Sequence, residues 1–169
     1  MHCPVDDIVL GETGIDVAKS SYANRPYVMS NLMNDEKEDT VYTCFGMNET
    51  PIPEGYEKNE FGFLFAELVN GGGIYQIVIR DSSFTCIGGL CVGDSGDVAL
   101  EYFGLQEIVF LEDTDLEWIL DNGAALSYHK DNEEEYFISY EMDKNRVTVK
   151  VVDGVIHYIS LLRESDLYE

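Results

Sequence analysis

Residues 11–18, GETGIDVA, recur as residues 93–99, GDSGDVA, with one residue deleted. The glycines at positions 11 and 93 are 82 residues apart, and the same offset relates residues 74–77, IYQI, to residues 156–159, IHYI. Two separate matches at one offset indicate an internal repeat. The chain of 169 residues is therefore interpreted as two copies of one unit, a first repeat over residues 1–83 and a second over residues 84–169.

Each copy is predicted to begin with a short helix. Thr13 and Ser95 have small polar side chains suited to an N-cap, and an Asp follows each of them in the first turn, where it favours the helix dipole. The helix of the first copy is expected over residues 16–23. The helix of the second copy places Val98 and Tyr102 at i and i+4 and ends where Gly104 supplies a glycine cap.

A second helix is predicted in each copy. In the first copy Pro26 opens it, with apolar side chains at positions 28, 29, 32 and 33; in the second, residues 113–115 open it, with apolar side chains at 116, 119 and 120. The rest of each copy is rich in β-branched and aromatic residues that alternate with turn residues. Antiparallel strands are predicted at residues 40–44, 61–69 and 74–80 and at residues 124–130, 135–142, 146–152 and 155–162.

Two motifs occur in both copies: a Gly-x-Ser/Thr turn before an acidic residue and Val, and a closing strand with Ile at positions one and four. Over nearly the whole chain this pattern resembles the β-lactamase inhibitor protein family, and small bacterial outer-membrane lipoproteins share its motifs in a single copy. The resemblance implies an α+β fold of two tandem helix-loop-helix plus antiparallel-sheet repeats that form a concave sheet surface. It also implies that this surface, rich in aromatic residues, binds a partner protein.

The charge of the chain restricts its partners. Ten basic residues against 33 acidic ones give a net charge of −23. Such a field repels nucleic-acid phosphates and anionic lipids, so direct nucleic-acid binding is disfavoured. The same field speeds association with a basic protein surface, although solubility alone is an alternative reason for it.

The sequence leaves the compartment open. It contains no apolar run of about eighteen residues, so no transmembrane segment is expected. The first residues, MHCPVDD, lack the basic and apolar regions of a secretion signal, which indicates a cytoplasmic protein. A leader removed before Cys3 would instead give a secreted or lipid-anchored protein.

The sequence predicts neither a cofactor nor a metal site. Cys3, Cys44, Cys86 and Cys91 do not have the spacing of zinc ligands and are interpreted as buried thiols, with a Cys86–Cys91 disulfide as the alternative in an exported protein. The three histidines are scattered, and no nucleophile or phosphate-binding motif is present. An enzyme is therefore not expected.

Aromatic residues of the sheets and acidic residues of the loops are the predicted contacts for a partner. Tyr and Trp give much contact area at low entropic cost, and loop carboxylates can meet a cationic surface. Because alternation turns about half of any strand toward the helices, each ring is also a candidate core residue. The predicted partner-binding residues are Tyr42, Tyr75, Trp118, Tyr128, Tyr136, Tyr140, Tyr158, Asp113, Asp115 and Glu134.

Together these features favour a non-enzymatic protein-binding module that occludes a basic partner protein, in the manner of an inhibitor or an immunity protein. Two alternatives remain: an envelope lipoprotein domain with a scaffolding role, and an acidic mimic of DNA. The sequence specifies neither the partner nor the oligomeric state.

Overall fold

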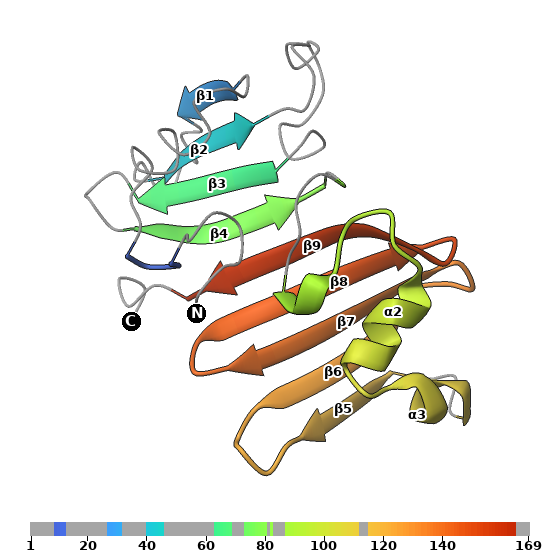
Figure 1. Cartoon of the computed structure of the whole chain (residues 1–169). Helices are drawn as coiled ribbons and strands as arrows, with labels where there is room; N and C mark the ends of the chain where they lie inside the picture. Colours follow the sequence, from blue (N-terminus) through green and yellow to red (C-terminus); the bar gives the residue numbers. More distant parts are fainter. Residues whose placement is uncertain are drawn as a thin grey trace.

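The computed structural model describes residues 9–12, 27–31, 40–45, 63–68, 73–80, 82, 87–111 and 115–164. Its strands form one sheet of nine strands in the order β1-β2-β3-β4-β9-β8-β7-β6-β5 (Figure 1). Every neighbouring pair is antiparallel. The strands are β1 (Tyr27–Asn31), β2 (Thr40–Phe45), β3 (Phe63–Leu68), β4 (Ile74–Ile79), β5 (Leu116–Ile119), β6 (Ala125–Lys130), β7 (Glu135–Met142), β8 (Asn145–Val152) and β9 (Val155–Arg163).

A short helical layer covers one face of the sheet over the β5–β9 half (Figure 1). In the described part of the chain it consists of the 3-10 helix η2 (Ile87–Gly89) and the α-helices α2 (Gly96–Tyr102) and α3 (Gln106–Leu111). Ser95 caps α2 by accepting a hydrogen bond from the Asp97 N–H at 3.3 Å, and Gly104 follows the helix with φ +71°. The predicted cap and terminal glycine are thus confirmed. None of the described helices is long and apolar enough to cross a membrane.

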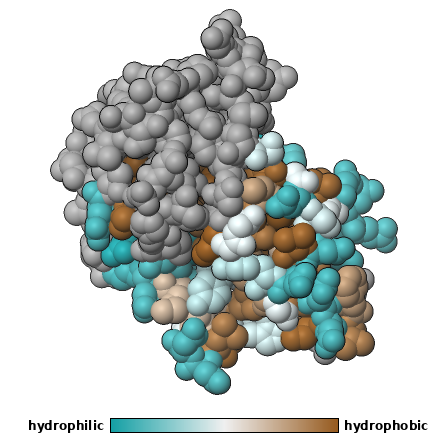
Figure 2. All heavy atoms as spheres, viewed as in Figure 1, coloured by the Kyte–Doolittle hydropathy of each residue, from teal (hydrophilic) through white to brown (hydrophobic). Residues whose placement is uncertain are grey.

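The main core lies between this helical layer and the sheet. Val147, Val149 and Val151 of β8 point toward the helices and are fully buried, as are Ile138 of β7 and Ile159 of β9. Burial of each such side chain contributes about 1.5–3 kcal/mol, so this face supplies most of the hydrophobic stabilisation of the described part. The outer surface of the layer, seen in Figure 2, mixes hydrophilic and apolar side chains.

The turn before the helical layer has a counterpart 82 residues earlier. The Gly11 N–H donates to the Ile74 carbonyl at 2.8 Å, and the Gly93 N–H donates to the Ile156 carbonyl at 2.8 Å. Both glycines have positive φ, +82° and +94°, which side chains other than glycine rarely adopt. Residues 9–12 and 91–94, which include the first two residues of each recurring stretch, therefore form the same turn, each against the first residues of a strand.

The strands at the middle of the sheet repeat in the same way. β4 pairs with β9 such that Val78 lies opposite Ser160, and these two residues are themselves 82 positions apart. That register is the one a two-fold axis between equivalent strands would produce. Each strand also has a β-bulge at the equivalent position, with Tyr75 and His157 as the extra residues. The boundary between repeats near residue 83 stays a prediction.

The predicted fold class, two helix-loop-helix plus sheet repeats, is wrong. The sheet is continuous through β4 and β9, and residues 27–31 and 116–119, both predicted to be helical, are the edge strands β1 and β5. In β5, Leu116 and Trp118 both point to the covered face, as alternate residues of a strand do. The segment is too short for a stable helix, and pairing with β6 satisfies its backbone hydrogen bonds. The predicted first helix, residues 16–23, lies outside the described residues.

The predicted strands are confirmed. Each of the seven predicted strands corresponds to an observed one, β2 to β4 in the first half and β6 to β9 in the second, with boundaries that differ by at most two residues. β-branched and aromatic composition between tight turns was therefore a sufficient signal for these elements.

Candidate functional site on the open face of the sheet

The face of strands β5–β9 opposite to the helices, here called the open face, has a central row of small hydroxyl side chains. Ser127, Ser139, Thr148 and Ser160 lie directly opposite one another on β6, β7, β8 and β9. They alternate along each strand with buried core residues, so they point away from the helices. The Ser139 and Thr148 hydroxyls share a hydrogen bond at 3.1 Å. This hydroxyl row forms a floor that can donate and accept hydrogen bonds.

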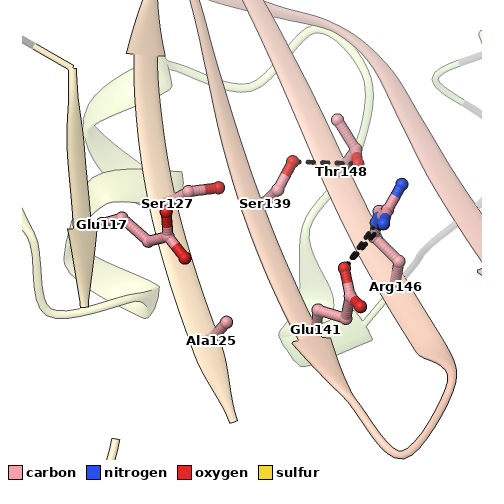
Figure 3. Close-up of a pocket in the computed structure, with 7 residues that line it drawn as sticks. All are labelled: Glu117, Ala125, Ser127, Ser139, Glu141, Arg146 and Thr148. Carbon is pink, nitrogen blue, oxygen red and sulfur yellow. Dashed lines mark hydrogen bonds and ion pairs between the residues drawn. The ribbon is translucent and has the colours of Figure 1, made fainter. Parts of the chain in front are cut away.

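One end of the hydroxyl row opens into a hollow of about 360 Å³, shown in Figure 3. Arg146 forms part of its wall and donates from Nε and Nη2 to Glu141 Oε2 at 2.9 and 2.7 Å. Because both side chains are over two-fifths exposed, this pair contributes little to stability, but it fixes the direction of both groups. The hollow is lined by Glu117, Ala125, Ser127, Ser139, Glu141, Arg146 and Thr148.

On the other side of the hydroxyl row, cations and aromatic rings alternate across the strands. His129, Phe137, Lys150 and Tyr158 are paired in register, and the Arg80 guanidinium lies 4.9 Å from the centre of the Tyr158 ring. The Lys150 ammonium lies 5.1 Å from the centre of the Phe137 ring, and the Phe137 and Tyr158 rings are 6.4 Å apart. These four residues and Arg80 are called the cation–aromatic ladder, and its cation–π contacts favour the observed positions of Arg80 and Lys150 over the rings.

His129, at the β6 end of the ladder, is held between two carboxylates. Its Nδ1 lies 2.9 Å from Asp115 Oδ2 and its Nε2 lies 2.9 Å from Asp131 Oδ1. The hydrogen bond to Asp115, supported by that to Asp131, raises the pKa of His129 above its ordinary value. A hydrogen bond from the Lys130 N–H and the contact with His129 lower the pKa of Asp115. The cluster ties the start of β5 to the turn between β6 and β7.

The open face is nearly neutral, in contrast to the whole chain at −23. Strands β5–β9 carry three acidic and two basic side chains on this face, and Arg80, which follows β4, adds a third cation beside Tyr158. Two of the acidic residues are paired across strands, Glu141 with Arg146 and Glu135 with Lys150 at 3.2 Å, and Glu164 Oε1 lies 3.8 Å from Arg146. The six residues are Glu117, Glu135, Glu141, Arg80, Arg146 and Lys150. The excess acidic charge of the described part therefore lies mainly in turns and helices.

The predicted partner-binding tyrosines divide between the two faces. Tyr158 belongs to the ladder on the open face, whereas Tyr128 is 4% exposed and packs in the core. Tyr136, Tyr140 and Trp118 are half-buried and pack against the same core, and burial raises the pKa of Tyr136 to about 12. These four side chains lie on the helix-covered side of the sheet.

The other predicted residues are more scattered. Tyr75 is the half-buried extra residue of the bulge in β4, Asp115 is exposed and holds His129, and Glu134 is exposed in the turn between β6 and β7. Asp113 and the side chain of Tyr42 lie outside the described residues.

Several open-face residues were missed by the sequence analysis, above all Phe137, Lys150, Arg146 and the hydroxyl row. A signal existed: Val147, Val149 and Val151 alternate with Thr148 and Lys150, so one set had to face away from the core. What the sequence could not give is the register between strands, which places Phe137 beside Lys150 and Lys150 beside Tyr158.

Among the described residues no group of three His, Cys, Asp or Glu side chains is arranged to hold a metal ion. The open face offers instead hydroxyl groups, two aromatic rings and oriented ion pairs. The sequence matches no protein-family model, and comparisons with curated proteins and with solved structures found no match.

Proposed function

We propose that the chain is a non-enzymatic protein-binding module and that the open face is its contact surface. The observation that carries this proposal is the cation–aromatic ladder on a sheet face that no described helix covers. Tyr, Phe and Arg are the residue types enriched at the centres of protein interfaces.

The preorganisation of the face supports binding. Lys150 is held by Glu135 at 3.2 Å and by the Phe137 ring, and Arg146 is held by Glu141. Side chains that are already ordered lose less conformational entropy when a partner arrives, so more of the contact energy remains as affinity. The hydroxyl row between them can satisfy polar groups of the partner.

The net charge of −23 favours a partner with a positive surface charge. The open face itself is balanced, so the acidic charge elsewhere acts at long range and accelerates the approach of a basic protein. We infer that the module occludes a functional surface of that basic partner, as an inhibitor or immunity protein does. Salt is then expected to slow association much more than it speeds dissociation.

Affinity capture from an extract of the source organism tests the proposal. The whole chain should retain a basic protein in stoichiometric amount at low salt. Phe137→Ala and Tyr158→Ala should weaken capture by at least about tenfold, as expected for interface hot spots, while Tyr102→Ala on the helix side should not. Failure to recover a partner, or equal loss with all three variants, would contradict the proposal.

A further inference from the structure

We propose that the hollow at the β5 end of the hydroxyl row receives an arginine side chain carried on a projecting segment of the basic partner. This inference rests on the proposed function and adds to it the identity of one contact.

The walls carry two carboxylates on separate strands. Glu117 of β5 and Glu141 of β7 both line the hollow, with β6 between them (Figure 3). Glu117 is level with Ser139, two residues before Glu141, so with about 4.8 Å between neighbouring strands and about 3.4 Å per residue their backbones are roughly 12 Å apart, which leaves room for a planar guanidinium between two side chains that reach inward. Arg146 contacts Oε2 of Glu141 and lies 3.8 Å from Glu164 Oε1, so the second oxygen of Glu141 is not taken by Arg146, and among the described residues Glu117 makes no ion pair. Two acceptor positions thus face the hollow.

The floor is suited to the same group. Ala125, Ser127 and Ser139 are small, so a long side chain can enter without displacing them. A guanidinium has five N–H donors in a rigid plane and binds carboxylate and hydroxyl oxygens together, which an ammonium does less well. The charged residues that line the hollow, Glu117, Glu141 and Arg146, have a net charge of −1, which an incoming arginine neutralises.

Other occupants fit less well. A second copy of the chain would bring another −23 charges to the same surface. A sugar would need an aromatic ring to stack on, and none of the residues that line the hollow is aromatic. A basic protein segment meets both the local charge of the hollow and the field of the whole chain.

A titration with a defined peptide tests this inference. The ¹⁵N-labelled whole chain is titrated with acetyl-Gly-Ser-Arg-Ser-Gly-amide and with the same peptide containing citrulline, the neutral isostere of arginine. The arginine peptide should produce saturable shifts at the amides of Glu117, Ser127 and Ser139 with a dissociation constant in the low millimolar range, about 4 kcal/mol of binding. Citrulline should weaken binding by at least about fivefold.

Matched variants localise the effect. Glu117→Gln should weaken the arginine peptide by about fivefold, while Glu107→Gln on α3, an equal loss of charge on the opposite side of the sheet, should leave it unchanged. Equal binding of both peptides, equal effects of both variants, or no saturable shift up to about 10 mM peptide would overturn the inference. Capture of a basic partner that depends on Phe137 and Tyr158 would still stand in that case, so the proposed function can survive without it.

Discussion

The two faces of strands β5–β9 are built from alternate residues of the same strands, yet they differ in polarity and packing. On β8, Val147, Val149 and Val151 are fully buried beneath the helices, while the intervening Thr148 and Lys150 line the open face. The covered face is apolar and packed, and the open face is polar, preorganised and balanced in charge. The comparison teaches that the packed core and the proposed contact surface lie one residue apart along each strand.

The largest expected effect is on the covered face. Ile159 is fully buried and pairs with Ile79 and Val149, so Ile159→Ala should lower the free energy of unfolding by about 2–5 kcal/mol through lost burial and a residual cavity. Its neighbour Ser160 is on the open face, and Ser160→Ala should cost less than about 1 kcal/mol. Urea unfolding of both variants measures the contrast. Similar losses would mean that the two faces are not distinct in packing.

A smaller effect is expected where the helical layer meets the sheet. A Cβ added at Gly96 would lie 2.4 Å from the Tyr136 hydroxyl and 2.7 Å from Val151 Cγ1, closer than side chains tolerate. Gly96→Ala should therefore destabilise by about 1–3 kcal/mol, although alanine favours a helix. Val98→Ala on the exposed side of the same helix should stay within about 0.5 kcal/mol. A stabilised Gly96→Ala protein would show that the layer is loosely packed.

The smallest effect concerns the exposed cluster of His129, Asp115 and Asp131 at the edge of the open face. Because the pKa of His129 is raised, its stabilising contact is fully present below the ordinary histidine pKa of about 6.5 and is lost as the pH rises through the folded-state pKa. The lowered pKa of Asp115 keeps that carboxylate charged in the same range and removes its contribution only in acid, as the pH falls through its folded-state pKa.

Thermal unfolding of the wild type and of His129→Gln between pH 5 and pH 9, the interval that brackets that value of about 6.5, measures this contribution. The wild type should be slightly the more stable protein at the acidic end, and the difference should shrink toward the alkaline end. A difference that grows with pH would have the wrong sign for the contact seen here.

Sequence reasoning succeeded where the signal was local. The strands from residue 124 to residue 162 could be read from composition and turns, and the Ser95 cap from a single side chain. It failed at β5, where apolar residues at 116, 119 and 120 fit a helical spacing as well as Leu116 and Trp118 fit a strand. The helix α2 was predicted, but its buried residues are Gly96, Ala99 and Leu100, while Val98 and Tyr102, which the helical spacing singled out, are exposed.

The candidate site was less accessible to prediction because it depends on contacts between distant residues. No local rule places Val78 opposite Ser160 or joins the two halves into one sheet. Without the register, the face on which each aromatic ring lies could not be predicted. Tyr158 was therefore among the predicted contact residues and Phe137, on the same face, was not. The repeat at an offset of 82 gave the symmetry of the strands but not their pairing.

The most direct test compares two neighbours on β7, Phe137 on the open face and Ile138 in the core. Unfolding and partner capture are measured for Phe137→Ala and Ile138→Ala. We predict that Phe137→Ala loses capture by at least about tenfold with the smaller loss of stability, and that Ile138→Ala loses about 2–5 kcal/mol while its folded fraction still binds. Capture that survives in Phe137→Ala but fails in folded Ile138→Ala would contradict the account.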